Sequence, residues 1–181
     1  MKTLIASGIA AVALVSSASA DVTFTFTNQV WTGFNFTEAY AAGSLTGTLT
    51  GATVNATLNA STNYTYADDL CIYVAGSPLA LGGALQCGGF SNLNATQRYG
   101  WANGASNAPG TTVTGTVNFT TGINMDAAST LSIWIGNGYG AAGTSGTFTG
   151  TITLLGVTAV PAPGAVALLG LAGFCSRRRR A

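Results

Sequence analysis

Carboxylates are the main groups in this chain that could carry out acid–base chemistry. The sequence has no histidine, and between residues 21 and 159 it has no lysine and a single arginine, Arg98. This composition removes the usual general base, the Ser–His pair and histidine-ligated metal sites. Glycosidases need only two carboxylates at a defined separation. The candidates are Glu38, Asp68, Asp69 and Asp126. No spacing among them singles out a pair, so the sequence favours a non-enzymatic protein.

The adjacent carboxylates of Asp68 and Asp69 also suit a calcium ion, which takes oxygen ligands. The other interpretation is that they cap a turn before the apolar strand that begins at Leu70, and the sequence favours this structural role. No Walker-type loop or dinucleotide fingerprint is present. We therefore expect no cofactor.

Two cysteines, Cys71 and Cys87, fall within the central part of the chain, with fifteen residues between them. In an oxidising compartment they can form a disulfide, which the chain-entropy model values at about 3 kcal/mol. Cys71 falls on the non-core side of its expected strand, where a loop could reach it. We therefore predict a Cys71–Cys87 disulfide, with two separate buried thiols as the alternative.

Three aromatic residues suggest a second kind of chemistry, the stacking of sugar rings on exposed π faces. Trp134 alternates with the apolar residues of its strand and is therefore expected on the threonine side, while Tyr99 and Trp101 fall in a loop. Together they are candidate glycan contacts. The alternatives are that these rings fill the edges of the core, or that the strand phase is shifted by one residue.

The elements that must position these residues are β-strands. Apolar and threonine residues alternate with period two in several segments, which is typical of half-buried strands. Examples are residues 22–27, 45–50, 53–58, 112–119 and 147–154. Two sheets that close their apolar faces on each other would bury them all. The sequence therefore predicts an all-β domain over residues 21–159, a β-sandwich of the jelly-roll type.

Charge is scarce, and the positive charge is concentrated in the ends of the chain. Charged residues make up 6% of the 181 residues and hydrophobic residues 48%. Lys2 and four arginines lie in the two ends, so the part between them has five acids against one base, a net charge of −4. One base cannot neutralise a phosphate backbone, so this composition excludes nucleic-acid binding.

The first twenty residues have the three regions of a secretory signal peptide. Lys2 gives a basic start, residues 4–15 are apolar, and Ala18-Ser19-Ala20 ends the segment with small residues. Cleavage by signal peptidase after Ala20 would leave Asp21 as the new N-terminus. We expect a signal-peptide helix over residues 1–20, rather than a buried N-terminal helix, and export of the domain that follows.

Residues 160–181 have a different order of motifs. Pro161-Ala162-Pro163-Gly164 interrupts the β pattern, residues 165–175 are small and apolar, and Arg177 to Arg180 form a cluster (Arg177, Arg178, Arg179, Arg180). This tail resembles the PEP-CTERM sorting signal of Gram-negative bacteria, although Ala162 stands where that family usually has glutamate. The alternative is a core helix with a charged end.

The resemblance implies an exosortase substrate that is held transiently in the inner membrane and cleaved near the proline motif. Arginines beside an apolar segment stay cytoplasmic. Eleven residues of helix cover about 16 Å, against a hydrocarbon core of roughly 30 Å, so residues 165–175 predict a short, weak helical anchor. The mature protein is then expected in the medium or on the cell surface.

A second resemblance covers residues 64–156. Residues 69–74, Gly88-Gly89-Phe90 and residues 145–154 look like the jelly-roll domain at the C-terminus of proprotein convertases. That resemblance implies a sandwich without catalytic residues.

These observations lead to three functional interpretations. The first is an exported, non-enzymatic surface or extracellular-matrix protein that lies within exopolysaccharide. The second is a carbohydrate-binding module that uses Trp134, Trp101 and Tyr99. The third is a hydrolase with a carboxylate pair, which the sequence favours least.

Overall fold

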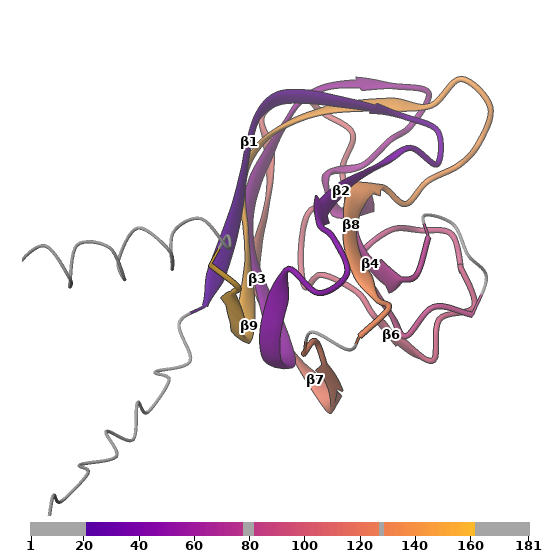
Figure 1. Cartoon of the computed structure of the whole chain (residues 1–181). Coiled ribbons are helices and arrows are strands. Elements are labelled where there is room, and N and C mark those ends of the chain that lie inside the picture. Colours follow the sequence, from indigo (N-terminus) through magenta and orange to yellow (C-terminus); the bar gives the residue numbers. More distant parts are fainter. Residues whose placement is uncertain (1–20, 78–81, 127–128, 162–181) are drawn as a thin grey trace, which may run out of the picture.

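A computed structural model describes residues 21–77, 82–126 and 129–161 (Figure 1). The signal peptide and most of the sorting tail expected from the sequence lie outside these residues, and so do the two terminal helices. The candidate residues concerned are Ala18, Ala20, Ala162, Pro163, Gly164 and Arg177 to Arg180. Asp21 and Pro161 are the outermost described residues, and both are exposed. Within the described ranges, no helix has the length and apolar character needed to cross a membrane.

The described part of the chain is predominantly β, with nine strands and one 3-10 turn, η1. In chain order the elements are β1 (Val22–Thr32), β2 (Phe36–Tyr40), β3 (Leu45–Thr62), η1 (Ala67–Asp69), β4 (Leu70–Ala75), β5 (Leu85–Cys87), β6 (Gln97–Tyr99), β7 (Thr111–Asn124), β8 (Ser132–Asn137) and β9 (Ser145–Ala159).

The strands form two sheets that face each other (Figure 1). One has four strands in the order β1-β9-β3-β7, and the other has five in the order β2-β8-β4-β5-β6. Neighbouring strands pair antiparallel, except for β5 and β6, which are parallel. The predicted all-β, sandwich-like fold is therefore confirmed.

The long strands form where threonine alternates with apolar residues. On β3 and β9, Val54 lies opposite Ile152 and both are buried, while the next pair, Thr53 and Thr153, is half-buried. Because successive side chains of a strand point to opposite faces, one face of this sheet is apolar and the other carries threonine.

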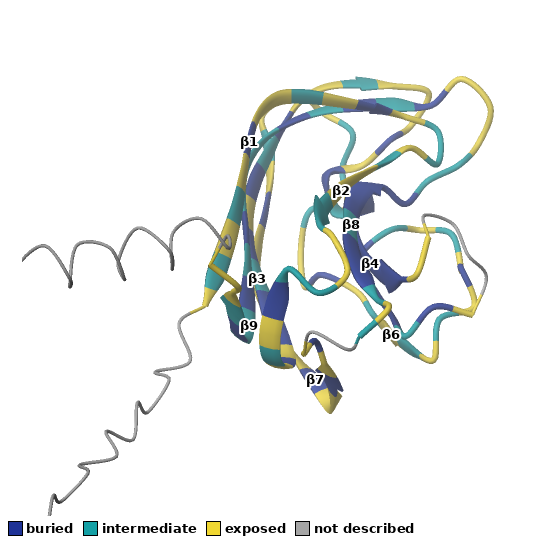
Figure 2. Cartoon of the chain, viewed as in Figure 1, coloured by how far each residue is buried: buried dark blue, intermediate teal, exposed yellow. Residues whose placement is uncertain are grey.

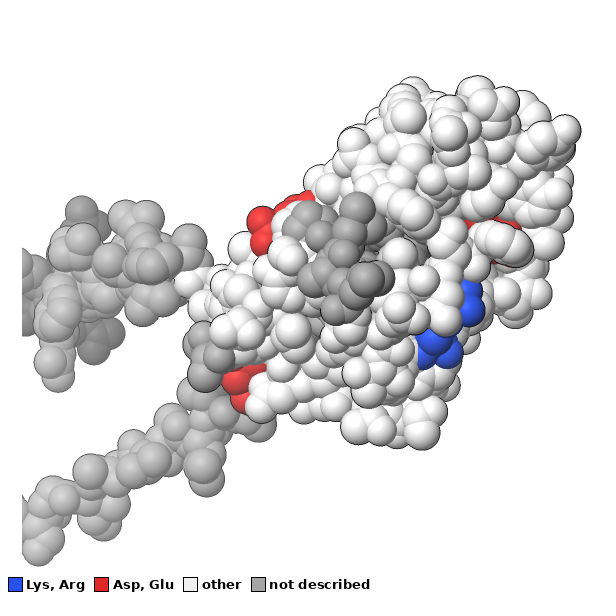
Figure 3. Space-filling model, turned by 90° about the vertical axis from the view of Figure 1, so that its right-hand side faces the viewer, with Lys and Arg blue, Asp and Glu red and all other residues white. Residues whose placement is uncertain are grey.

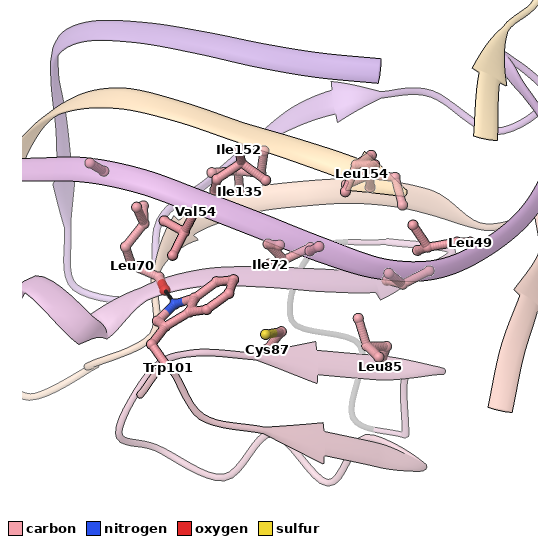
Figure 4. Packing of buried hydrophobic residues seen from close by; sticks show 14 of the residues in the cluster. Leu49, Val54, Leu70, Ile72, Leu85, Cys87, Trp101, Ile135, Ile152 and Leu154 are labelled. Carbon is pink, nitrogen blue, oxygen red and sulfur yellow. Dashed lines mark hydrogen bonds between the residues drawn. The ribbon is translucent and has the colours of Figure 1, made fainter. Parts of the chain in front are cut away.

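The core lies between the two sheets, where the buried residues of both meet (Figure 2). Leu49, Val54, Ile152 and Leu154 of the four-stranded sheet pack in one cluster with residues of β4, β5 and β8 (Figure 4). Ile72 of β4 is one of these partners. Burying a side chain of this size contributes about 1.5–3 kcal/mol, so the shared cluster is the main source of stability.

A second, smaller cluster covers the outer face of the five-stranded sheet. Tyr73, Ala75 and Leu93 are buried there, with Trp134 and Phe36 among the partly buried residues packed against them. Every residue of β4 is consequently buried, including those that point away from the core.

The outer face of the four-stranded sheet carries threonines in register across its strands. Thr23 of β1 lies opposite Thr153 of β9, which lies opposite Thr53 of β3, which lies opposite Thr116 of β7. The hydroxyls of Thr23 and Thr153 are hydrogen-bonded at 2.8 Å, as are those of Thr53 and Thr116. A second row, two residues along, contains Thr25, Thr151, Asn55 and Thr114. We call these residues the threonine rows.

The prediction of a Cys71–Cys87 disulfide is wrong in this structure, where both residues are free and buried. Cys87 lies on β5 directly opposite Ile72, and both belong to the core cluster (Figure 4). Cys71 precedes Ile72 on β4 and therefore points to the opposite face of the sheet. Two cysteines whose side chains point apart cannot be bridged without moving the backbone.

Both thiols are expected to resist labelling in the folded protein. Burial raises the pKa of Cys87 to about 12 and raises that of Cys71 well above its ordinary value, so little thiolate forms at neutral pH. Titration with a thiol reagent should label neither residue in the native state and both in denaturant without reductant. If the reagent labels neither cysteine in denaturant, the two cysteines form a disulfide.

Candidate functional site

The three aromatic residues predicted as glycan contacts do not gather on one surface. Trp134 lies on the outer face of the five-stranded sheet, but it is half-buried in the second cluster and its Nε1 donates a 3.2 Å hydrogen bond to the Ala75 carbonyl. Trp101 is buried in the main core, and its Nε1 donates to the Leu70 carbonyl at 2.7 Å (Figure 4). Tyr99 packs against the same core with its ring beside Phe119. Two of the three rings therefore fill core edges, and the expected full exposure of Trp134 is wrong.

The four candidate carboxylates also lie in different surroundings. Glu38 is exposed on β2, whose partner is β8. Asp126 accepts hydrogen bonds from the Thr46 hydroxyl at 2.8 Å and the Gly47 amide at 3.0 Å, and these bonds lower its pKa. Only Asp68 and Asp69 lie together in a pocket.

That pocket has a volume of about 640 Å³. Aromatic rings make up much of its lining, together with two carboxylates and a guanidinium. The lining residues include Tyr64, Tyr66, Asp68, Asp69, Phe90, Arg98, Trp101 and Tyr139. We call it the aromatic pocket. Its volume lies within the roughly 300–1,000 Å³ that is typical of small-molecule sites.

Four segments of the chain build the pocket. Tyr64 and Tyr66 lead into η1, Phe90 follows β5, Arg98 and Trp101 come from β6 and the residues after it, and Tyr139 follows β8. Arg98 Nη2 donates a 2.8 Å hydrogen bond to the Phe90 carbonyl, which joins two of these segments.

Asp69 joins two of the segments through its carboxylate. Its Oδ2 accepts a hydrogen bond from the Tyr66 amide at 2.7 Å, and its Oδ1 accepts one from the Phe90 amide at 3.0 Å. The structural alternative considered for this residue, a cap on the turn before Leu70, therefore agrees with its contacts. The described residues contain no group of three or more His, Cys, Asp or Glu side chains that could hold a metal ion.

The backbone at one wall of the pocket is strained. Asn63 and Tyr64 both have positive φ values, 51° and 68°, in the left-handed region that residues other than glycine adopt rarely. The Asn63 side chain donates a 3.0 Å hydrogen bond to the Gly143 carbonyl, which holds this turn in place. Strained residues of this kind cluster at binding sites, where the surrounding structure holds them.

Burial changes the acidity of both carboxyl groups in the pocket. It raises the pKa of Asp69 to about 6, an increase that the neighbouring Asp68 adds to and the two amide hydrogen bonds oppose. Burial also raises the pKa of Asp68.

The pKa of Asp69 predicts a pH-dependent stability. The folded state holds this proton more tightly than the unfolded state between the ordinary value of 3.8 and about 6. The free energy of unfolding is therefore expected to fall as pH rises through this interval and to level off above it. Urea unfolding of the wild type and of Asp69→Asn at several pH values measures this, because the variant lacks the titration. A stability difference that does not change with pH would contradict the prediction.

Little in the sequence indicates this site. Tyr64, Phe90 and Tyr139 lie outside the strands, where no periodicity shows which way a side chain points. The one local signal is the short distance along the chain from Tyr64 and Tyr66 to the carboxylates of Asp68 and Asp69. No protein-family model matches this chain, and no curated protein or solved structure shows significant similarity to it.

Proposed function

We propose that this chain is an exported, exosortase-sorted protein that acts without catalysis at the cell surface or in the extracellular matrix, in association with exopolysaccharide. Its neutral outer face is the main support. The threonine rows contain no acidic or basic residue. They present hydroxyl, amide and methyl groups. The opposite side of the molecule, where the five-stranded sheet lies, also carries only small charged areas (Figure 3).

A surface of this kind suits a matrix of neutral sugar chains. Hydroxyls and amides can exchange hydrogen bonds with polysaccharide and water in either direction, since each hydroxyl both donates and accepts. Without charge, this exchange does not depend on salt, in contrast to a surface that works through ionic attraction.

The positions of the carboxylates also support a role without catalysis. Asp69 holds two backbone amides, and Asp126 is bonded to Thr46 and Gly47 in a different part of the molecule. Glu38 lies on β2, which is not among the elements that line the aromatic pocket.

We propose the jelly-roll topology for the domain. The strand order supports it. The strands β1 to β4 alternate between the two sheets, and the late strands β8 and β9 are each inserted between two of these early strands. β9 lies between β1 and β3 in one sheet, and β8 lies between β2 and β4 in the other. Two interlocked Greek keys would give this strand order, with the parallel strand β6 as an addition.

Intact mass of the protein recovered from the medium and the matrix fraction of the native host tests the proposal. We expect a species that begins at Asp21 and ends near Pro163. Ala20→Arg should prevent processing at the first site, and replacing Arg177 to Arg180 with serine should prevent sorting by the tail. Recovery of a form that keeps these arginines, or of protein confined to the cytoplasm, would contradict export and sorting.

A further inference from the structure

Exposed aromatic side chains are concentrated at the aromatic pocket. Five large hydrophobic residues are exposed in the described part of the chain, and three of them line this pocket. They are Tyr64, Tyr66 and Phe90, with exposed fractions of 70%, 38% and 76%. Single exposed hydrophobic residues are ordinary, but a group of them around one hollow indicates a binding surface.

Phe90 is exposed and yet firmly held. Its amide donates to Asp69 Oδ1 at 3.0 Å, and its carbonyl accepts from Arg98 Nη2 at 2.8 Å. Its ring meets that of Tyr139 edge to face, with centroids 5.8 Å apart and an interplanar angle of 87°. A ring fixed in this way loses little conformational entropy on binding a ligand.

Tyr64 stands in the same pocket on the strained turn described above. The left-handed backbone conformation does not bury the Tyr64 ring, which remains largely exposed. A backbone conformation that is unfavourable and leaves an aromatic ring in solvent fits a residue that contacts a ligand.

Polar groups lie among these rings. Asp68 is half-buried in the lining, and Arg98 is exposed and has further N–H donors besides the one bonded to Phe90. The pocket thus combines flat apolar surfaces with a carboxylate that accepts hydrogen bonds and a guanidinium that donates them. A pyranose ring has the matching groups, an apolar C–H face and hydroxyls around its edge.

We propose that the aromatic pocket binds a neutral hexopyranose unit of a polysaccharide, with the sugar ring against Tyr64 and Phe90 and its hydroxyls bonded to Asp68 and Arg98. The inference rests on the proposed matrix role, which supplies polysaccharide as the ligand. The lining carries both signs of charge, in Asp68 and Asp69 on one hand and Arg98 on the other, so a charged sugar of either sign meets a like charge there and a neutral sugar does not.

Affinity electrophoresis tests this with the mature protein purified from the native host, in gels that contain a neutral β-glucan, a galactomannan, an alginate or a chitosan. The wild type should be retarded by at least one neutral polymer. Phe90→Ala and Tyr64→Ala should each weaken that binding roughly tenfold, the value of one aromatic contact. Phe90→Tyr keeps the ring and should preserve binding, and Val30→Ala is the control, since Val30 is 52% exposed on β1 outside the pocket.

Three other results of the electrophoresis would overturn the proposal. Equal binding by Phe90→Ala, Tyr64→Ala and the wild type would mean that sugar binds elsewhere, and retardation by alginate or chitosan alone would exclude a neutral ligand. Binding to none of the polymers, by a protein whose urea unfolding is normal, would remove the pocket as a sugar site. The intact-mass and matrix-recovery measurement separately decides the proposed function, because it does not depend on the pocket.

Discussion

Replacing Gly88 with alanine is expected to destabilise the folded domain by about 3 kcal/mol, the sum of a left-handed backbone penalty and an overpacking cost. Gly88 has φ +80°, where a side chain is strained. A Cβ at this position would also collide with the Leu70 carbonyl oxygen and with Trp101 Nε1. These two atoms are hydrogen-bonded to each other, so neither can move freely.

Urea unfolding of the two proteins measures the difference. Gly100→Ala is the matched control, since Gly100 lines the same pocket, has no positive φ and would place its added Cβ with no other atom within 4 Å. The control should unfold within about 0.5 kcal/mol of the wild type. Similar stability of the Gly88→Ala protein would mean that Trp101 does not occupy the position described.

Replacing Gln86 with methionine is expected to lower the free energy of unfolding by about 3 kcal/mol, because it removes three hydrogen bonds to the segment that follows β5. Gln86 is fully buried on β5, opposite Tyr73. Its Nε2 donates to the carbonyls of Gly88 and Ser91 at 3.2 and 2.7 Å, and its Oε1 accepts from the Leu93 amide at 2.9 Å.

Methionine has a similar length but no comparable donor or acceptor, so it leaves the buried Leu93 amide without this partner. Thermal or urea unfolding should show the loss, and hydrogen exchange of the Leu93 amide should become faster. Gln29→Met on β1 is the control, since Gln29 is only half-buried and its side chain makes one bond to a neighbouring carbonyl. Equal losses for the two variants would contradict the prediction.

The sequence predicted the long strands well because each contains enough alternation to set its phase. The same alternation put Trp134 on the correct face of its sheet. It could not show that Tyr73, Leu93 and Phe36 would cover that face, since this depends on segments far apart in the chain.

Short elements were less predictable. β5 has three residues, too few to show a period, so Cys87 was expected in a loop beside Cys71 rather than on the core face opposite Ile72. Trp101 follows the equally short β6, so no periodicity indicates that it is buried in the core with its Nε1 bonded to the Leu70 carbonyl. The aromatic pocket depends on four connecting segments, which explains why the sequence singled out Asp68, Asp69 and Trp101 but none of its other rings.

The position of β9 bears on how the domain would withstand a mechanical load. β9 is paired with β1 from Ser145 to Leu154 on one side, and with β3 from Ser145 to Ala159 on the other. A pull on Ala159 along the strand would load both ladders in shear, so that many hydrogen bonds would have to break together. β1 is bonded on one side only and starts at Val22, so a pull there meets a single ladder. The end of the domain nearest the proposed anchor is thus the end better built to bear tension.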